Sequence, residues 1–203
     1  MSESVSIEPA GVVATACRQR GSDIVNYADD LVICCRGRAE EARANMRNIM
    51  TTLKLTVNEM KTRVCKLPEE KFDFLGYTFG QCYSPKTGRR YLGTVPSKKR
   101  VIRICETISE MTGRDQILLD QGLVVAKLNR VMIGWANYFC LGPVSKAYRA
   151  VDSHACKRLR QWLRRKHSIS WQVTQRFSDA VLHDKLGLAR LTRRTRSLPW
   201  ATS

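Results

Sequence analysis

The sequence predicts an α+β protein in which a small antiparallel sheet with one packed helix is followed by an all-helical part. Two observations indicate this. Short apolar runs flank a pair of adjacent acids, Asp29 and Asp30, in the first half, and from Val101 onward apolar residues recur every three or four positions. We expect a disordered lead-in over residues 1–21, a sheet domain over residues 22–95 and a helical domain over residues 96–203.

Charge separates the two halves of the chain. The 203 residues carry a net charge of +17, and residues 96–203 hold 21 of the Lys and Arg residues but only 7 of the Asp and Glu residues. Such a surplus favours nucleic acid as the partner, because each neutralised phosphate releases condensed counterions; an anionic lipid surface is the alternative. Since no apolar run of membrane-spanning length and no signal segment occurs, we expect a cytoplasmic protein without a membrane partner.

Residues 24–35 predict a hairpin whose two strands both belong to a core. Asp29 and Asp30 lie between the strands, where two neighbouring carboxylates repel each other unless a cation compensates. Hard carboxylate oxygens suit magnesium, so the sequence indicates a Mg²⁺ site at this turn. A solvated Asp-Asp turn is the alternative.

The next segments predict a helix and more strands. An apolar stripe predicts a helix over residues 38–53, formed by Ala42, Met46, Ile49 and Leu53. Residues 63–67 and 72–79 predict two strands, and residues 91–95 predict another after a turn. Lys98, Lys99 and Arg100 then mark a basic linker that suits phosphate contacts, with a solvated charge run as the alternative.

Three helical segments are predicted in the second half, the most apolar of which spans residues 124–139. Its Trp135 is interpreted as a packing anchor rather than a base-stacking platform. The last, over residues 146–167, has an apolar seam and eight cations that repel one another unless a phosphate backbone relieves them. The predicted RNA-binding cations on this helix are Lys146, Arg149, Lys157, Arg158, Arg160, Arg164, Arg165 and Lys166.

Four stretches in order resemble the C-terminal part of a group II intron-encoded reverse transcriptase and maturase. Residues 27–30, Tyr-Ala-Asp-Asp, resemble the catalytic hairpin of reverse transcriptases. Residues 53–62 and 72–79 are similar to later parts of the palm, and residues 128–139 resemble the thumb or maturase (X) domain. The implied fold is a truncated antiparallel palm sheet followed by a helical thumb domain.

The resemblance also implies roles for single residues. Asp29 and Asp30 would be catalytic ligands of Mg²⁺ in a nucleotidyltransferase, and Lys61 would approach the triphosphate of the incoming nucleotide. A surface lysine is the equal alternative for Lys61. The stretch Phe74, Leu75, Gly76 and Tyr77 resembles the primer-grip hairpin, although core packing explains its aromatic residues equally well.

The sequence departs from the family upstream. A reverse-transcriptase palm takes another metal-binding Asp from an earlier strand, and neither Asp23 nor Glu8 is a convincing substitute. We therefore expect an incomplete Mg²⁺ site and a fragment, from truncation, a split gene or a damaged reading frame, that does not polymerise DNA alone. Its expected partners are intron RNA, an RNA/DNA primer-template and a missing amino-terminal reverse-transcriptase chain.

The alternative function is that of a maturase-type, RNA-binding splicing factor without polymerase activity. A third interpretation, a generic helical adaptor, holds only if the chain binds no nucleic acid. The eight cysteines include no C-x-x-C pair, so we expect no structural zinc. A basic tail is predicted over residues 190–196, and residues 197–200 resemble the end of bacterial members of the family.

Overall fold

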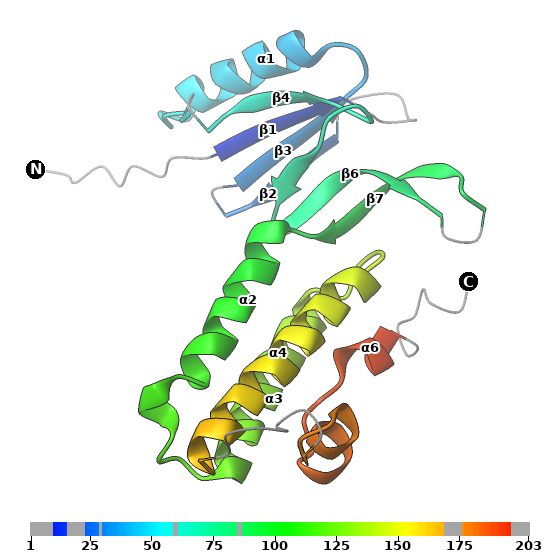
Figure 1. The fold of residues 1–203 in the computed structure, drawn as a ribbon. Helices are drawn as coiled ribbons and strands as arrows, with labels where there is room; N and C mark the ends of the chain where they lie inside the picture. The colour runs from blue at the N-terminus through cyan, green and yellow to red at the C-terminus, as the bar shows by residue number, and fades with distance from the viewer. Residues whose placement is uncertain are drawn as a thin grey trace, which may run out of the picture. The chain divides into compact units, whose positions relative to one another are not determined.

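The computed structural model, drawn in Figure 1, describes residues 10–15, 23–28, 30–58, 61–84, 87–168 and 176–195. The chain divides into two compact units, Met1–Thr94 and Val95–Ser203. The described strands lie in the first unit, apart from the end of the last one, and the second unit is otherwise helical. This arrangement agrees with the predicted α+β class.

The first unit contains a four-stranded sheet in the order β2-β3-β1-β4. Its strands are β1 (Ala10–Thr15), β2 (Asp23–Tyr27), β3 (Asp30–Cys35) and β4 (Arg63–Lys66). The predicted hairpin is confirmed, because β2 and β3 pair antiparallel with Tyr27 opposite Asp30. Ala28 adopts a φ of 53° in the tight turn between them.

Strand β1 corrects two expectations. It lies inside the segment expected to be disordered, and it pairs in parallel with both β3 and β4, so the sheet is mixed and not wholly antiparallel. The physical reason is that β3 is the buried strand of this sheet, and its second edge needs a hydrogen-bonding partner. The Ala and Gly residues of β1 have low strand propensity, which hid it in the sequence.

Helix α1 (Ala39–Thr52) lies on this sheet as predicted, but the apolar stripe is only partly buried. Met46 is buried with Leu31 and Ile33 of β3. In contrast, Ile49 is 53% exposed, and all five residues of β2 are exposed although both hairpin strands were expected in the core. The reason is that β2 is an edge strand, which has a neighbour on one side only.

A second sheet has the order β5-β6-β7, formed by β5 (Phe72–Phe74), β6 (Tyr77–Tyr83) and β7 (Arg90–Pro96). The predicted strand over residues 72–79 is in fact a hairpin, in which Phe74 pairs with Tyr77. The turn residues Leu75 and Gly76 have φ values of 51° and 82°, which a two-residue hairpin loop with both residues in the left-handed region requires.

The second unit is built on three long helices, α2 (Lys98–Met111), α3 (Gln121–Tyr138) and α4 (Ser145–Lys166). Short segments complete it, namely η1 (Arg114–Gln116), η2 (Val181–Lys185) and α6 (Leu191–Arg194). One hydrophobic core joins them, and its members Leu128, Met132, Leu159 and Trp162 are completely buried. The predicted core role of residues 124–139 is therefore confirmed.

Two basic segments differ from expectation. Lys98, Lys99 and Arg100 form the first turn of α2 and not a linker, because the Ser97 side chain caps this helix by accepting a hydrogen bond from the Arg100 N–H (3.4 Å). The predicted tail contains α6, whose Leu191 is fully buried. Within the described residues, every helix is too short or too polar to cross a membrane.

Candidate nucleic-acid interface

Helix α4 separates an apolar face from a cationic one. The five predicted seam residues are each at most 1% exposed: Tyr148, Val151, Ala155, Leu159 and Trp162. At 100° per residue these positions fall on one side of the helix. The seam is therefore buried as predicted, which leaves the opposite side of α4 to solvent.

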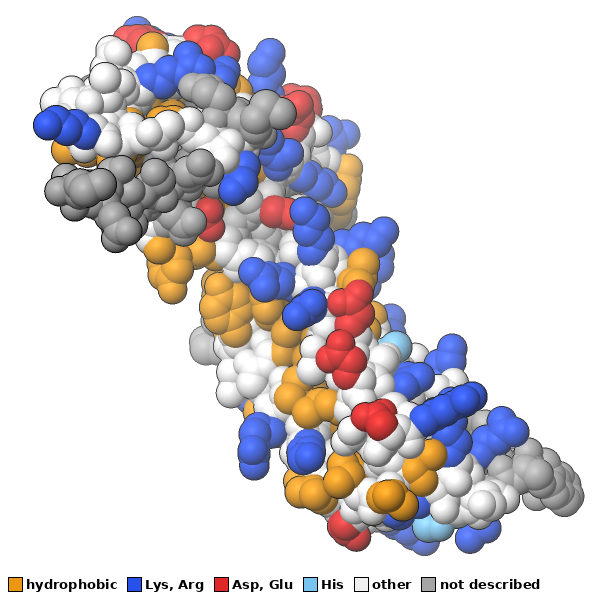
Figure 2. All heavy atoms as spheres, turned by 90° about the vertical axis from the view of Figure 1, so that its left-hand side faces the viewer, with side chains coloured by type: hydrophobic (Ala, Val, Ile, Leu, Met, Phe, Trp, Pro, Cys, Tyr) orange, Lys and Arg blue, Asp and Glu red, His pale blue; other side chains and the backbone are white. Residues whose placement is uncertain are grey.

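Five of the eight cations on α4 are exposed: Lys146, Arg149, Lys157, Arg164 and Arg165. Lys146, Lys157 and Arg164 are separated by 11 and 7 residues, close to three and two full turns, so they form a line about 27 Å long. We call these five residues the outer cations of α4. Figure 2 shows one face of the molecule, on which blue Lys and Arg side chains outnumber red acidic ones.

Acidic residues do not balance these cations on α3 and α4. The two helices together contain one acid, Asp152, and its side chain is buried at 8% exposure. An exposed helix face made soluble by mixed charges would carry acids at three- or four-residue spacing from its cations. The outer cations instead form a surface of one sign, which attracts a polyanion.

Arg158, Arg160 and Lys166 of α4 are half-buried and contact other segments of the second unit. The Arg158 guanidinium donates hydrogen bonds to the carbonyl oxygen of Ser109 (2.8 Å) and to the Oγ1 (3.1 Å) and carbonyl oxygen (3.3 Å) of Thr112. Two turns later, the Lys166 ammonium donates to the carbonyl oxygens of Ile117 (3.1 Å) and Leu119 (2.7 Å). These two side chains hold the α2–α3 connection against α4.

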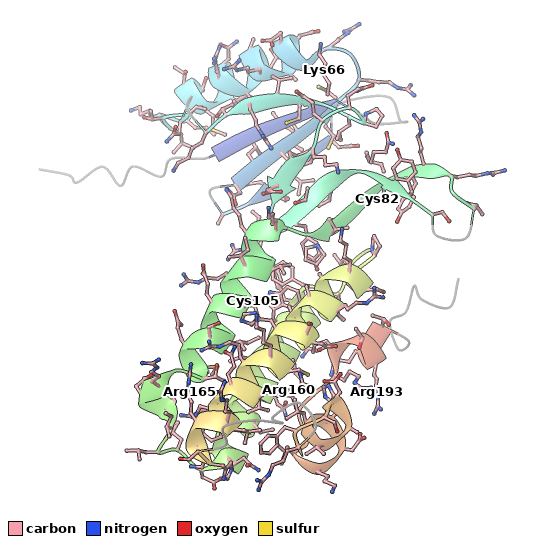
Figure 3. The ribbon with its side chains drawn as sticks, viewed as in Figure 1. Lys66, Cys82, Cys105, Arg160, Arg165 and Arg193 are labelled. Atoms are coloured by element: carbon pink, nitrogen blue, oxygen red, sulfur yellow. The ribbon has the colours of Figure 1, made fainter. Side chains whose placement is uncertain are left out.

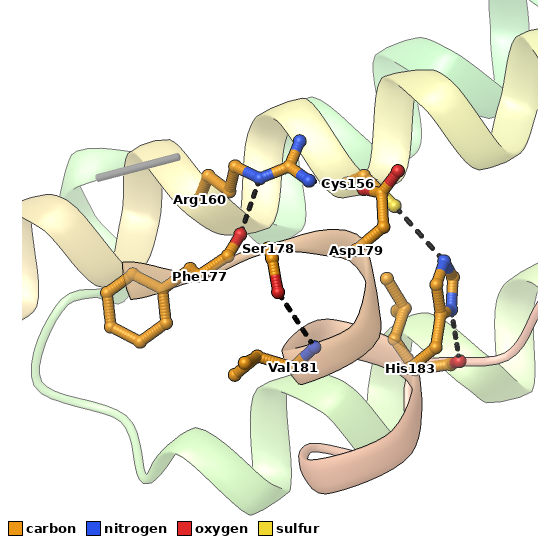
Figure 4. Close-up of polar contacts among 8 residues, drawn as sticks. Cys156, Arg160, Phe177, Ser178, Asp179, Val181 and His183 are labelled. Carbon is orange, nitrogen blue, oxygen red and sulfur yellow. Dashed lines mark hydrogen bonds and ion pairs between the residues drawn. The ribbon is translucent and has the colours of Figure 1, made fainter. Parts of the chain in front are cut away.

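Arg160 holds the segment that follows α4. Its Nε donates to the carbonyl oxygen of Phe177 (2.7 Å; Figure 4). Its guanidinium also forms an ion pair with Asp179. Arg160 and Arg165 are five residues apart and therefore lie on different sides of α4 (Figure 3). The structure thus gives Arg158, Arg160 and Lys166 internal roles that the sequence analysis did not anticipate.

A buried thiol lies beside Arg160. The Sγ of Cys156 is 3.4 Å from Nε2 of His183, and Nδ1 of the same ring is 2.8 Å from the carbonyl oxygen of Leu188 (Figure 4). Burial raises the pKa of Cys156 to about 11, so the thiol stays protonated at neutral pH. This contact packs the η2 segment onto α4 and does not create a reactive nucleophile.

A second histidine lies between α2 and α4. Nε2 of His154 is 2.9 Å from the Ser109 hydroxyl oxygen, and both residues line an open hollow of about 440 Å³. Desolvation by burial lowers the pKa of His154, and the nearby positive charges of Arg158 and Lys157 lower it further. The His154 imidazole therefore stays neutral down to a lower pH than an exposed imidazole does.

Two polar side chains that the sequence analysis missed fix the C-terminal segment. The Asp152 carboxylate accepts hydrogen bonds from the backbone N–H groups of Leu191 (2.9 Å) and Thr192 (3.0 Å) and from the Thr192 hydroxyl (2.9 Å). Asn129 of α3 donates to the carbonyl oxygen of Gly187 (2.8 Å) and accepts from the N–H of Ala189 (2.7 Å). Asp152 is the one acid in α3 and α4, and this is the sequence feature that could have pointed to a structural role for it.

The residues predicted for magnesium and primer chemistry lie in the first unit. Asp30 begins β3 and is half-buried, whereas its expected partner Asp29 lies outside the described residues. Lys61 is exposed, and its backbone N–H donates to the Asn58 side chain (3.2 Å). Among the described residues, acids, cysteines and histidines form no group of three that could hold a metal ion.

Of the two carboxylates predicted to bind magnesium, the described residues include Asp30. We assign no catalytic step to these residues. The primer-grip-like residues Phe74, Leu75, Gly76 and Tyr77 form the tight β5–β6 turn, where Tyr77 is buried and the others are half-buried.

Comparison with known protein families finds a match within the second unit. The family model described as "Group II intron, maturase-specific domain" matches residues 101–178. The matched range runs from the first turn of α2 through α3 and α4 to Ser178, and so includes all five outer cations of α4. No curated protein matches the chain.

Proposed function

We propose that this chain binds structured intron RNA through its second unit and so assists RNA splicing, because residues 101–178 match the group II intron maturase-specific domain family. The observation that carries the proposal is the set of outer cations on α4. They lie opposite a fully buried seam, and the only acid on α3 and α4 is buried. A cationic surface without stacking aromatic residues favours contacts with the phosphate backbone and recognition of RNA shape.

The start of α2 supports the same proposal. Lys98, Lys99 and Arg100 are exposed in the first turn, where the partial positive charge of the helix end makes cations unfavourable. Bound phosphate groups would offset that cost. These three residues precede the matched family range, so they extend the proposed RNA contacts to the beginning of the second unit.

A second candidate function is RNA-directed DNA polymerisation, which two features of the first unit favour. The β2–β3 hairpin places Asp30 beside a tight turn, and the β5–β6 hairpin presents Gly76 in a backbone conformation that suits glycine. Extension of a primed RNA template by the purified chain, abolished by Asp30→Asn, would establish this activity. We rank it below RNA binding because the family match covers residues 101–178, which lie in the second unit.

The test of the primary proposal is the affinity of the full chain for a folded group II intron RNA across a series of salt concentrations. If the five outer cations each neutralise one phosphate, the logarithm of the association constant falls with the logarithm of salt concentration with a slope of about −4. Acceleration of intron splicing under low-magnesium conditions is the functional readout. A flat salt response, or tighter binding to anionic vesicles than to RNA, would contradict the proposal.

A further inference from the structure

The connection between α2 and α3 presents a leucine to solvent from a rigid support. Leu118 is 94% exposed, more than any other large hydrophobic residue that the structure describes. The carbonyl oxygens of both its neighbours in the chain accept hydrogen bonds from the Lys166 ammonium, at 3.1 and 2.7 Å. The carbonyl oxygen of Gln116 accepts another from Nε1 of the completely buried Trp162 (3.0 Å). Helix α4 therefore fixes the backbone around Leu118 while the leucine side chain stays outside the core.

A fixed backbone makes Leu118 suitable as an anchor for a partner. A leucine on a mobile loop loses conformational freedom when a partner binds it, whereas this backbone is already held, so binding costs less free energy. Leu123, in the first turn of α3, is 46% exposed and adds apolar surface at the same end of the second unit. We call Leu118 and Leu123 the leucine knob. Burial of this knob in an apolar hollow would stabilise a contact.

The first unit contains such a hollow, an apolar groove of about 510 Å³ that residues of α1, β2 and β3 line. Two of its lining residues, Ile24 and Ile49, are 60% and 53% exposed, whereas Leu31 and Met46 are buried. All the described lining residues are apolar or asparagine, so the groove itself carries no charge. Exposed apolar surface that is gathered in one place is typical of an interaction site.

Charge decides which surfaces of two copies of the chain can approach each other. Residues 106–120 hold four of the seven acids of the second unit but one of its 21 Lys and Arg residues, and Asp115 and Asp120 are exposed on either side of Leu118 in the chain. The first unit is nearly neutral, with 14 Lys and Arg against 11 Asp and Glu residues, and the exposed Lys54 immediately precedes a lining residue of the groove. The acidic end of one copy therefore meets the first unit of another without the repulsion that two cationic surfaces experience.

We propose that the leucine knob of one copy of this chain docks into the apolar groove of a second copy. The contact covers the exposed side chains of Ile24 and Ile49 and brings Asp115 and Asp120 toward Lys54. Because it joins two different surfaces, the association is head-to-tail. The outer cations of α4 take no part in it, so self-association and the proposed RNA binding use separate surfaces.

Other occupants explain less of the structure. A small apolar molecule in the groove would leave the leucine knob exposed, and an unrelated protein that received the knob would leave the groove open. A second copy covers both features with one contact, and its charges are complementary at the same place.

The first experiment is sedimentation velocity of the nuclease-treated full chain at increasing protein concentration. We expect the sedimentation coefficient to rise with concentration. Leu118→Gln and Ile49→Gln should each weaken the association about tenfold or more, because glutamine removes the apolar contact without changing the net charge. Ile102→Gln and Leu92→Gln are the matched controls, since they make a similar change at residues that are 47% and 50% exposed outside the knob and groove. The controls should associate as the unaltered chain does.

The second experiment mixes the two variants that associate weakly. The Leu118→Gln chain keeps an intact groove and the Ile49→Gln chain keeps an intact knob, so the mixture offers one complete contact. We expect a fluorescently labelled Leu118→Gln chain to bind the unlabelled Ile49→Gln chain with an affinity close to that of the unaltered chain for itself. A contact between two different surfaces gives this recovery, and a contact of one surface with itself does not.

Three results would overturn the proposal. The first is a sedimentation coefficient that is independent of concentration, which is also the result expected if the knob docks within its own chain. The second is equal weakening by the control substitutions, and the third is failure of the mixed variants to associate. Circular dichroism melts establish that each variant is folded, and Ile24→Thr tests the groove if Ile49→Gln unfolds. Since RNA affinity is measured separately, the proposed function stands or fails independently of this inference.

Discussion

Replacing the buried acid Asp152 by asparagine should release the C-terminal segment from α4. The carboxylate accepts three hydrogen bonds at 2.9–3.0 Å, two of them from the first backbone N–H groups of α6. An asparagine side chain would be isosteric but would offer one acceptor oxygen, so its amide group would face either the Leu191 N–H or the Thr192 donors. Because Leu191 is fully buried, the N–H left without an acceptor cannot turn to water.

The expected cost follows from these contacts. Charge-assisted hydrogen bonds contribute about 1.5–3 kcal/mol each and neutral ones about 0.5–1.5 kcal/mol, and an unsatisfied buried donor costs about 1–3 kcal/mol. Since two of the three bonds can survive in neutral form, we expect Asp152→Asn to lower the free energy of unfolding by about 2–4 kcal/mol. This range already includes the loss of the N-terminal cap that the Asp152 carboxylate provides for α6.

The assay is urea unfolding followed by tryptophan fluorescence, because Trp162 in the same core is fully buried and changes environment on unfolding. Asp184→Asn is the matched control, since it removes the same charge from an exposed position of η2, in the same unit. The control should change the free energy of unfolding by less than about 0.5 kcal/mol. Equal effects of the two substitutions would refute the role given to Asp152.

Three further predictions concern the interior of the second unit. Arg158→Gln should lower the free energy of unfolding by about 1–3 kcal/mol in the same urea assay, because it removes charge-assisted bonds to the end of α2; no change would mean that those contacts are not formed in solution. In native protein, Cys156 should be alkylated about a hundredfold more slowly than an unperturbed thiol, because its pKa of about 11 exceeds the ordinary 9.0; mass spectrometry against the half-buried Cys140 tests this. Since burial lowers the pKa of His154 below 6.5, the unfolded chain takes up the proton first as the pH falls through 6.5, and the second unit should lose stability there. His154→Gln should reduce that loss, and an unchanged pH profile would count against it.

Local patterns were sufficient to predict the long helices. The seam of α4 recurs at three- and four-residue spacing with large apolar side chains, and a helix of that length keeps its period whatever packs against it. The predicted and observed ends of α4 differ by one residue at each side. Local signals also predicted the β2–β3 hairpin, because the Ala28 turn is short and closes within its own sequence.

Elements that depend on distant partners could not be predicted in this way. Strand β1 is weak in propensity and exists through pairing with β3 and β4, and α6 has four residues and is capped from α4. The same limit applies to the candidate site. Periodicity places Arg158 and Lys166 on α4, but the carbonyl groups that they bind belong to the end of α2 and to the α2–α3 connection, which no local pattern could bring to them.

The salt dependence of RNA binding by a variant lacking three outer cations tests the central claim most directly. The variant Lys146→Gln, Arg149→Gln and Lys157→Gln removes exposed charges from α4, and Lys54→Gln, Lys66→Gln and Lys71→Gln remove the same number from exposed positions of the first unit. We expect the first variant to bind folded intron RNA more weakly, with a salt slope shallower by about 2–3 and an unchanged free energy of unfolding, and the second to keep the original slope. Equal slopes for the two variants and the unaltered chain would contradict RNA binding through α4.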